Sequence, residues 1–272
     1  MSSSSSVPPP TSQGNPIMEN YERWSSQTPF VTRTVMITVV FVYIMSWVFD
    51  ADTVLGNIPY FSVFHYEIYR IFFSFLVGNS FLSVIMIAMF FPAMAGRMEY
   101  ALGSSGILIL MGTIAITTNM IFLTICLIMY EMGTPEAMFW SCSSFWTVIF
   151  GLLTIECMQM PDTPRRMFMI PVDIPSKYFP LVLYGFFCLF SGLILSYLIS
   201  IVVGYVYVLG HLDGLKVSQI RLAASENSGW LSSFSRYIPI EKFPGALVLK
   251  FVFNFYFCQF WSSIGWLVGW LM

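Results

Sequence analysis

Long apolar segments separated by short polar ones dominate this chain and predict a bundle of transmembrane helices. A bilayer core of about 30 Å needs roughly twenty helical residues, or fewer where the membrane is locally thin. The segments with this length and apolar character are 33–49, 71–95, 106–129, 138–158, 179–195 and 197–211. We therefore expect an all-α polytopic membrane protein with a bundle of six transmembrane helices.

The last two of these segments belong to one uninterrupted apolar run, which extends from Tyr178 to Gly210. Because this run is too long for one straight helix, we place a break near Ser191 and Gly192. Each resulting helix has about fifteen residues and, at 1.5 Å per residue, spans only about 22 Å. We expect the bilayer to be thinned around them.

The six helices form a predicted transmembrane domain at 31–212, and three other parts of the chain lie outside it. Residues 1–30 are rich in Ser and Pro and lack the apolar stretch of a secretory signal, which predicts a disordered tail. Residues 213–244 form a polar segment on the inner side. Residues 245–272 predict a C-terminal hydrophobic helix rich in aromatic residues, which either crosses the membrane as a seventh span or lies in its interface.

The composition agrees with a membrane protein. Of the 272 residues, 57% are hydrophobic and only 10% are charged, whereas about a quarter of a soluble domain is charged. The net charge of −2 does not favour nucleic acid, so the expected partners are membrane lipids and other membrane proteins. The five cysteines form no C-x-x-C pair, and we expect no metal, no cofactor and no small-molecule substrate.

The distribution of basic residues predicts the orientation. With six spans, ten of the twelve basic residues lie on the side that holds both ends of the chain: Arg23, Arg33, Arg97, Arg165, Arg166, Lys177, Lys216, Arg221, Arg236 and Lys242. Arg70 lies on the opposite side, and Lys250 lies in the C-terminal hydrophobic segment. The positive-inside rule then places both termini in the cytosol, or in the matrix if the membrane is mitochondrial.

Small residues recur at every fourth position in the fourth and sixth segments. These positions are Ser143, Thr147, Gly151, Ser196, Ser200 and Gly204. Such stripes let two transmembrane backbones approach closely. Ordinary bundle packing explains either stripe alone, but the two together favour a specific close contact between the fourth and sixth helices.

Polar motifs stand at the two ends of the second predicted helix. The first motif, E-I-Y-R, contains Tyr69 and Arg70, and we expect Arg70 to anchor the preceding loop by bonding backbone carbonyls. The second motif is G-R-M-E-Y-A-L-G-S, with its characteristic residues at Arg97, Glu99, Gly103 and Ser104. We expect Arg97 and Glu99 to bond helix ends or to pair with the 159–178 loop. Asn119, in the third helix, should find a partner across the bundle.

Two further motifs lie in the fourth and sixth helices. They are S-F-W-T-V-I-F-G-L-L at 144–153 and Y-L-I-S-I-V-V-G at 197–204. In their order and spacing, the four motifs resemble the rhomboid superfamily of intramembrane proteases over roughly residues 66–215. In that family the first motif ends in Trp-Arg, so Tyr69 here replaces a tryptophan.

The resemblance implies that the catalytic dyad is absent. Active rhomboids have G-x-S-G-A-I-F-G-L-L and H-x-x-G-x-x-x-G where this chain has the last two motifs. The alignment places Trp146 at the nucleophile and Tyr197 at the histidine. An indole has no nucleophile, and a phenol with a pKa near 10 is a poor base at neutral pH. We interpret the two residues as an aromatic plug in the space of the dyad; the alternative is that they face lipid.

A second serine motif must be weighed against this reading. The run Gly103-Ser104-Ser105-Gly106 also fits G-x-S-G, and would make Ser105 a nucleophile with His211 as the base expected on the same side. We favour a simpler interpretation, in which Ser104 or Ser105 caps the N-terminus of the third helix.

Within the superfamily, the segment from Met160 to Gly185 resembles the loop between spans four and five of derlins and of the UBA-domain-containing pseudoproteases of the endoplasmic reticulum. This resemblance implies a non-catalytic scaffold that binds membrane or lumenal clients in protein quality control. The alternative is a structural subunit of a large organellar complex, such as one in the mitochondrial inner membrane. The scaffold is our first hypothesis. Two features of the 211–243 segment favour the alternative: it shows no motif for recruiting the extracting ATPase, and it is too short for a ubiquitin-binding domain. An active intramembrane serine protease is the third hypothesis.

Overall fold

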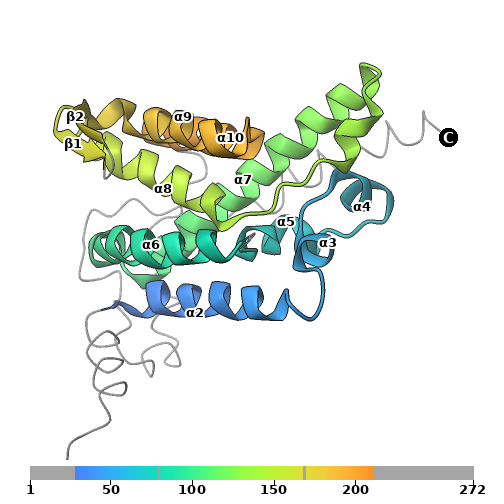
Figure 1. The fold of residues 1–272 in the computed structure, drawn as a ribbon, viewed down its shortest axis with the longest axis horizontal. Helices are drawn as coiled ribbons and strands as arrows, with labels where there is room; N and C mark the ends of the chain where they lie inside the picture. Colours follow the sequence, from blue (N-terminus) through green and yellow to red (C-terminus); the bar gives the residue numbers. More distant parts are fainter. Residues whose placement is uncertain (1–27, 79, 168–169, 211–272) are drawn as a thin grey trace, which may run out of the picture.

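The fold is that of a computed structural model, which describes residues 28–78, 80–167 and 170–210 (Figure 1). Most of the predicted N-terminal tail, the polar segment 213–244 and the hydrophobic segment 245–272 lie outside the described residues. His211, the base proposed for Ser105, also lies outside them.

Helices make up most of the described chain. The longer ones are α2 (Phe30–Met45), α6 (Phe81–Leu102), α7 (Ser104–Glu131), α8 (Phe145–Gln159), α9 (Phe179–Ser191) and α10 (Leu195–Val208). Both α6 and α7 are long and apolar enough to cross a membrane, and the other four are shorter apolar helices. By length and composition the described residues therefore support a mostly helical membrane protein, while six membrane crossings remain a proposal.

The short elements lie at the two ends of these helices (Figure 1). At one end are α3 (Ala51–Leu55), α4 (Pro59–Phe64), α5 (Tyr69–Phe73) and the 3-10 turns η1 (Ser74–Leu76) and η2 (Pro135–Phe139). At the other end, strands β1 (Pro164–Met167) and β2 (Ile170–Pro175) form an antiparallel hairpin, followed by the 3-10 turn η3 (Ser176–Tyr178). The all-α expectation missed this hairpin, because the prolines and charged residues of the segment predict a loop, and only the pairing of the two strands shows otherwise.

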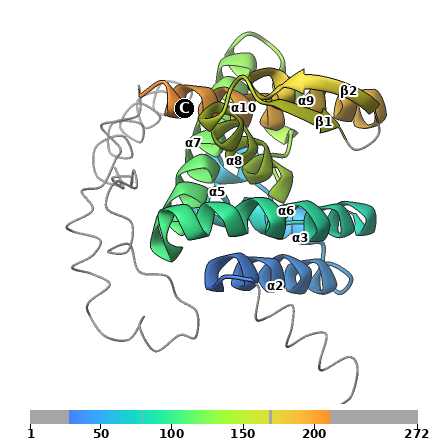
Figure 2. The same ribbon diagram turned by 90° about the vertical axis from the view of Figure 1, so that its left-hand side faces the viewer.

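The longer helices form layers. Figures 1 and 2 both place α6 between α2 on one side and the α8–α10 layer on the other, with α7 crossing between the layers. The main core lies where these layers meet, and Phe91 of α6 packs edge-on against Phe145 of α8 with ring centroids 4.8 Å apart. Such edge-on aromatic pairs stabilise the contact between the layers.

Two predicted helix boundaries were wrong. The second helix was expected at 71–95, but α5 and η1 end at Leu76, and α6 starts at Phe81 after Ser80 accepts a hydrogen bond from the Ser83 N–H. The fourth helix was expected at 138–158, but α8 starts at Phe145, where Ser144 is the capping residue. In both places the expected segment ran through a short polar stretch, Gly78 to Ser80 or Ser141 to Ser144, and the serine at its end caps the helix that begins there.

The predicted break in the last apolar run is confirmed. Helix α9 ends at Ser191, and Gly192 has a φ of 74°, a backbone angle that glycine adopts without a side-chain penalty. Helix α9 has 13 residues and α10 has 14, which leaves both shorter than a typical membrane span.

The structure brings α8 and α10 into the close contact that the small-residue stripes predict. The hydroxyl of Ser200 donates to the Thr147 carbonyl at 2.5 Å. A side chain at Gly204 would meet Thr154 and the carbonyl oxygen of Gly151, so the backbones touch at this point. Ser143 does not take part, because it precedes the α8 cap, and its hydroxyl bonds the α3 end of the molecule instead.

We expect Gly204→Ala to destabilise the protein by about 1–3 kcal/mol, the usual cost of overpacking. The new Cβ would lie 2.7 Å from Thr154 Cβ and 2.9 Å from the Gly151 carbonyl oxygen. Gly112→Ala on α7 is the matched control, because no heavy atom lies within 4 Å of its Cβ position. Equal unfolding transitions of the two variants in detergent would contradict close packing at Gly204.

Candidate functional site

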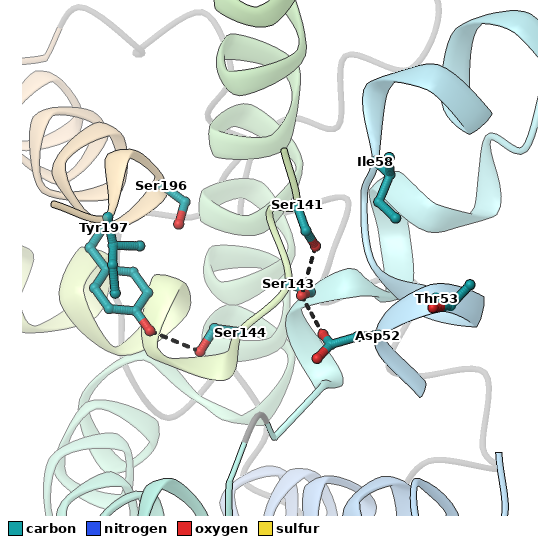
Figure 3. A pocket seen from close by; sticks show the side chains of 9 residues that line it. Asp52, Thr53, Ile58, Ser141, Ser143, Ser144, Ser196 and Tyr197 are labelled. Carbon is teal, nitrogen blue, oxygen red and sulfur yellow. Dashed lines mark hydrogen bonds between the residues drawn. The ribbon is translucent and has the colours of Figure 1, made fainter. Parts of the chain in front are cut away.

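A polar cavity of about 270 Å³ opens at the end of the molecule that carries α3 (Figure 3). Its walls come from three places in the chain: the α3–α4 segment, the serine-rich segment 141–144 directly before α8, and the start of α10. The lining residues are Asp52, Thr53, Ile58, Ser141, Ser143, Ser144, Ile194, Ser196 and Tyr197. One carboxylate and six hydroxyl-bearing side chains therefore surround the space.

The serine-rich segment is extended, which explains why its hydroxyls reach the cavity. Cys142 pairs with Asn57 through two backbone hydrogen bonds, of 3.0 and 3.4 Å. Since alternate residues of an extended chain point to opposite sides, Cys142 is buried while Ser141 and Ser143 face the cavity. The Ser143 hydroxyl donates to Asp52 at 2.5 Å, and the hydroxyls of Ser141 and Ser143 lie 3.0 Å apart (Figure 3).

Ser144 closes the floor of the cavity. Its hydroxyl oxygen accepts from the Trp146 backbone N–H at 3.2 Å and from the Tyr197 hydroxyl at 3.2 Å. The first bond is a helix cap and the second ties α10 to the start of α8. Ser144 is thus used as an acceptor at the junction of the two helices.

Trp146 and Tyr197, the residues aligned with the rhomboid dyad, are both buried inside the protein, with 4% and 6% of their surfaces exposed. Their rings pack on shared neighbours, with Trp146 4.8 Å from Phe187 and Tyr197 5.2 Å from Phe150. The indole N–H of Trp146 donates to the Ser83 hydroxyl at 2.8 Å, which links α8 to α6. An aromatic cluster therefore fills the interior below the cavity.

Arg70 anchors the loop that carries Asp52, as expected from the sequence. Its guanidinium donates to the carbonyls of Thr53 at 2.6 Å and Gly56 at 2.9 Å. It also pairs with Glu67 at 2.5 Å, and this hydrogen bond lowers the pKa of the Glu67 carboxyl. Tyr69 is exposed, and its hydroxyl donates to the Val54 carbonyl at 3.2 Å.

Asn119 has the cross-bundle partners that its position in α7 predicts. Its side-chain oxygen accepts from Asn57 at 3.1 Å, and its amide nitrogen donates to the Ile71 carbonyl at 2.9 Å and the Ser74 hydroxyl at 2.8 Å. Asn57 in turn pairs with Cys142. The buried amides therefore hold the α3–α5 segment and the serine-rich segment in one fixed arrangement.

Glu99 ties together the opposite end of the bundle. Its fully buried carboxylate accepts from the Val31 N–H at 2.9 Å and from both the N–H and the hydroxyl of Thr32 at 2.8 Å. The Ser104 hydroxyl donates a fourth bond of 2.5 Å. Glu99 thus satisfies the first backbone donors of α2, which has Pro29 at its cap position and no side-chain cap of its own.

The structure corrects the role of the serines at the start of α7. The cap residue is Gly103, with a φ of 79° and no side-chain cap. Ser104 is already helical, and its hydroxyl donates to Glu99 instead of capping the helix. Ser105 lies beside it, in the α6–α7 corner that Glu99 joins to α2.

Arg97 pairs within the same end of the molecule, but not directly with the 159–178 loop as one alternative proposed. Its guanidinium lies 2.8 Å from Glu156 near the end of α8, and Arg165 of the hairpin lies 3.4 Å from the same carboxylate. Glu156 therefore connects Arg97 to the loop. Because the Arg97 side chain is largely exposed, this pair contributes little to stability.

Several residues of the cavity were missed by sequence reasoning. Asp52 and Ser141 belong to no motif, and Ser144 was considered only as the start of an aligned segment. The polar run Ser141-Cys-Ser-Ser directly before an apolar helix was a usable signal for a capped, extended entry. Only the fold could bring that run beside Asp52, which lies about ninety residues earlier in the chain.

The chain matches no model of a known protein family, and no curated protein matches it. The resemblance to rhomboids therefore depends on the four sequence motifs alone.

Proposed function

We propose that the protein is a catalytically inactive, rhomboid-like membrane scaffold that binds other membrane proteins as clients in endoplasmic-reticulum quality control, with both termini in the cytosol. The observation that carries this proposal is the burial of Trp146 and Tyr197 at the two positions aligned with the rhomboid dyad. By this alignment, an indole without a nucleophile and a phenol that is a poor base stand at the two positions that carry the chemistry in active rhomboids.

The surroundings of these residues support a structural use of the site. The Ser144 hydroxyl already accepts two hydrogen bonds, one of which caps α8. The one histidine among the described residues, His65, packs against the rings of Tyr60 and Phe61 in the α4 region and does not line the cavity. No imidazole in the described chain is therefore placed to activate Ser144.

The outer surface supports a scaffold that works within the membrane. Large apolar side chains are exposed on α6 and α9, including Leu82, Leu189 and Phe190. Such a surface faces either lipid or the apolar segment of another membrane protein. The short helices α9 and α10 favour a locally thin bilayer on this side, where a client segment crosses a shorter apolar barrier.

Affinity purification of the full chain from native membranes tests the proposed function. We expect ubiquitin-ligase components and an extracting ATPase to copurify in substoichiometric amounts, as transient partners do. Stoichiometric recovery of respiratory or ATP-synthase subunits would contradict the proposal and favour a structural subunit of an organellar complex.

The absence of catalysis is tested separately with a fluorophosphonate probe, which labels activated serines. We expect no labelling of the wild-type protein in membranes. Labelling that is lost in Ser144→Ala or in Ser105→Ala, but kept in the other variant, would identify an active nucleophile and overturn the inactive assignment.

A further inference from the structure

We infer that the cavity between α3, the serine-rich segment and α10 binds a primary ammonium group, carried either by the head group of an ethanolamine lipid or by a small soluble amine. The inference does not depend on the proposed scaffold function. It is based on the charge, the hydrogen-bonding groups and the size of the cavity.

Among the residues that the structure describes, the charge of the cavity comes from Asp52 alone, and no basic side chain lines the space. The half-buried Asp52 carboxylate accepts one hydrogen bond on Oδ1, from Ser143. Among the described residues, no donor reaches its Oδ2 and no Lys or Arg forms an ion pair with it. The cavity therefore presents a carboxylate oxygen without a cationic partner.

Arg70, the basic residue of the same loop, does not neutralise this carboxylate. Its guanidinium is occupied by Glu67 and by the carbonyls of Thr53 and Gly56. The bond to Thr53 instead fixes the short helix α3 on which Asp52 lies. Within the described part of the chain, Asp52 is thus held in place without a cationic partner, so less entropy is lost when a ligand binds it.

The hydroxyls complete a site for an ammonium group, which has three donors and no acceptor. Asp52 Oδ2 can accept one donor, and the hydroxyl oxygens of Ser141 and Ser196 offer further acceptors on the other walls (Figure 3). Ile58 and Ile194 also line the space, and can contact the carbon atoms next to the nitrogen. The charge and the three donors of an ammonium group therefore match the carboxylate and the hydroxyl acceptors of the cavity.

The size, the donor set and the charge exclude three other ligand classes. Drug-sized ligands fill cavities of about 300–1,000 Å³, so a cavity of about 270 Å³ fits a smaller group. A divalent metal ion prefers several oxygen ligands with more than one carboxylate, and the described residues contain no group of three or more side chains suited to hold one. An anionic ligand would face the Asp52 charge without a basic partner.

The soluble arm of the test uses the purified full chain in nanodiscs of phosphatidylcholine alone, titrated calorimetrically with ethanolamine. We expect saturable binding that weakens at least about tenfold in Asp52→Asn, because a hydrogen bond to a charged group contributes this much. Glu136→Gln is the control, since it removes one exposed negative charge from η2, outside the cavity. Choline, which is cationic but has no N–H donor, should bind at least tenfold more weakly than ethanolamine.

The lipid arm uses nanodiscs that contain phosphatidylethanolamine, with native mass spectrometry as the readout. Retention of this lipid by the wild type but not by Asp52→Asn assigns the ammonium to a head group. Ethanolamine binding without such retention assigns it to a soluble amine. Ser141→Ala, at an exposed position, is a second variant that should weaken binding several-fold if Asp52→Asn does not fold. Absence of binding in both arms, equal binding by Asp52→Asn, or equal binding of choline overturns the inference.

Discussion

Replacing Glu99 by alanine is expected to lower the free energy of unfolding by about 3–5 kcal/mol, because each buried donor left without an acceptor costs about 1–3 kcal/mol. Four donors converge on this carboxylate, from Val31, Thr32 and Ser104. We expect a total below the sum of the single costs, because water entering the space left by the Glu99 side chain would satisfy some of these donors. The start of α2 would then detach from the α6–α7 corner.

The matched control is Glu131→Ala, which removes an exposed carboxylate from the end of α7. Reversible unfolding in mixed micelles measures both variants, and proteolysis near residue 30 reports release of α2. A loss for Glu99→Ala that is no larger than that of the control would show that the four bonds contribute nothing net.

Replacing Trp146 by alanine is expected to cost about 3–5 kcal/mol, the range for truncation of large aromatic residues in a core. The ring is 4% exposed and packs against Phe187, so its removal leaves a cavity between α8 and α9. It also leaves the Ser83 hydroxyl without its indole donor. The transition measured in detergent should fall accordingly.

Trp47→Ala provides the control, because this tryptophan is 75% exposed after the end of α2. Trp146→Phe separates the two contributions, since phenylalanine keeps most of the ring contacts and loses only the bond to Ser83. We expect this variant to lose about 1 kcal/mol for the hydrogen bond, plus a smaller packing loss. A neutral result for Trp146→Ala would mean that the aromatic cluster is not a stabilising plug.

Apolar patterning predicted the helices but not where they start. The run from Tyr178 to Gly210 had to break, because its length exceeded one span and Gly192 could reverse the chain without a side-chain penalty. The starts of α6 and α8 were misplaced, because the expected segments extended through the short polar stretches before these helices, Gly78 to Ser80 and Ser141 to Ser144. Single serine caps, at Ser80 and Ser144, decide them.

For single polar residues in apolar surroundings, the sequence also predicted the type of hydrogen bond that each one forms. Arg70 had to bond carbonyls and Asn119 had to bond across the bundle, because a polar group at that depth is costly when unsatisfied. Their actual partners, Thr53 and Gly56 for the first and Asn57 and Ser74 for the second, come from other elements. The sequence could therefore specify the type of bond but not its geometry.

By itself, the sequence determined that this is a helical, apolar chain in which the last hydrophobic run must divide and the polar residues within it must be satisfied. Only the tertiary structure decided that Glu99 serves α2, that Ser143 leaves the helix stripe, and that a carboxylate and six hydroxyl-bearing residues form one cavity. The physical reason is the distance along the chain over which each interaction acts. Hydropathy and helix capping act over a few neighbouring residues, whereas Asp52, Ser143 and Tyr197 meet only after the packing of α3, α8 and α10 has fixed their backbones.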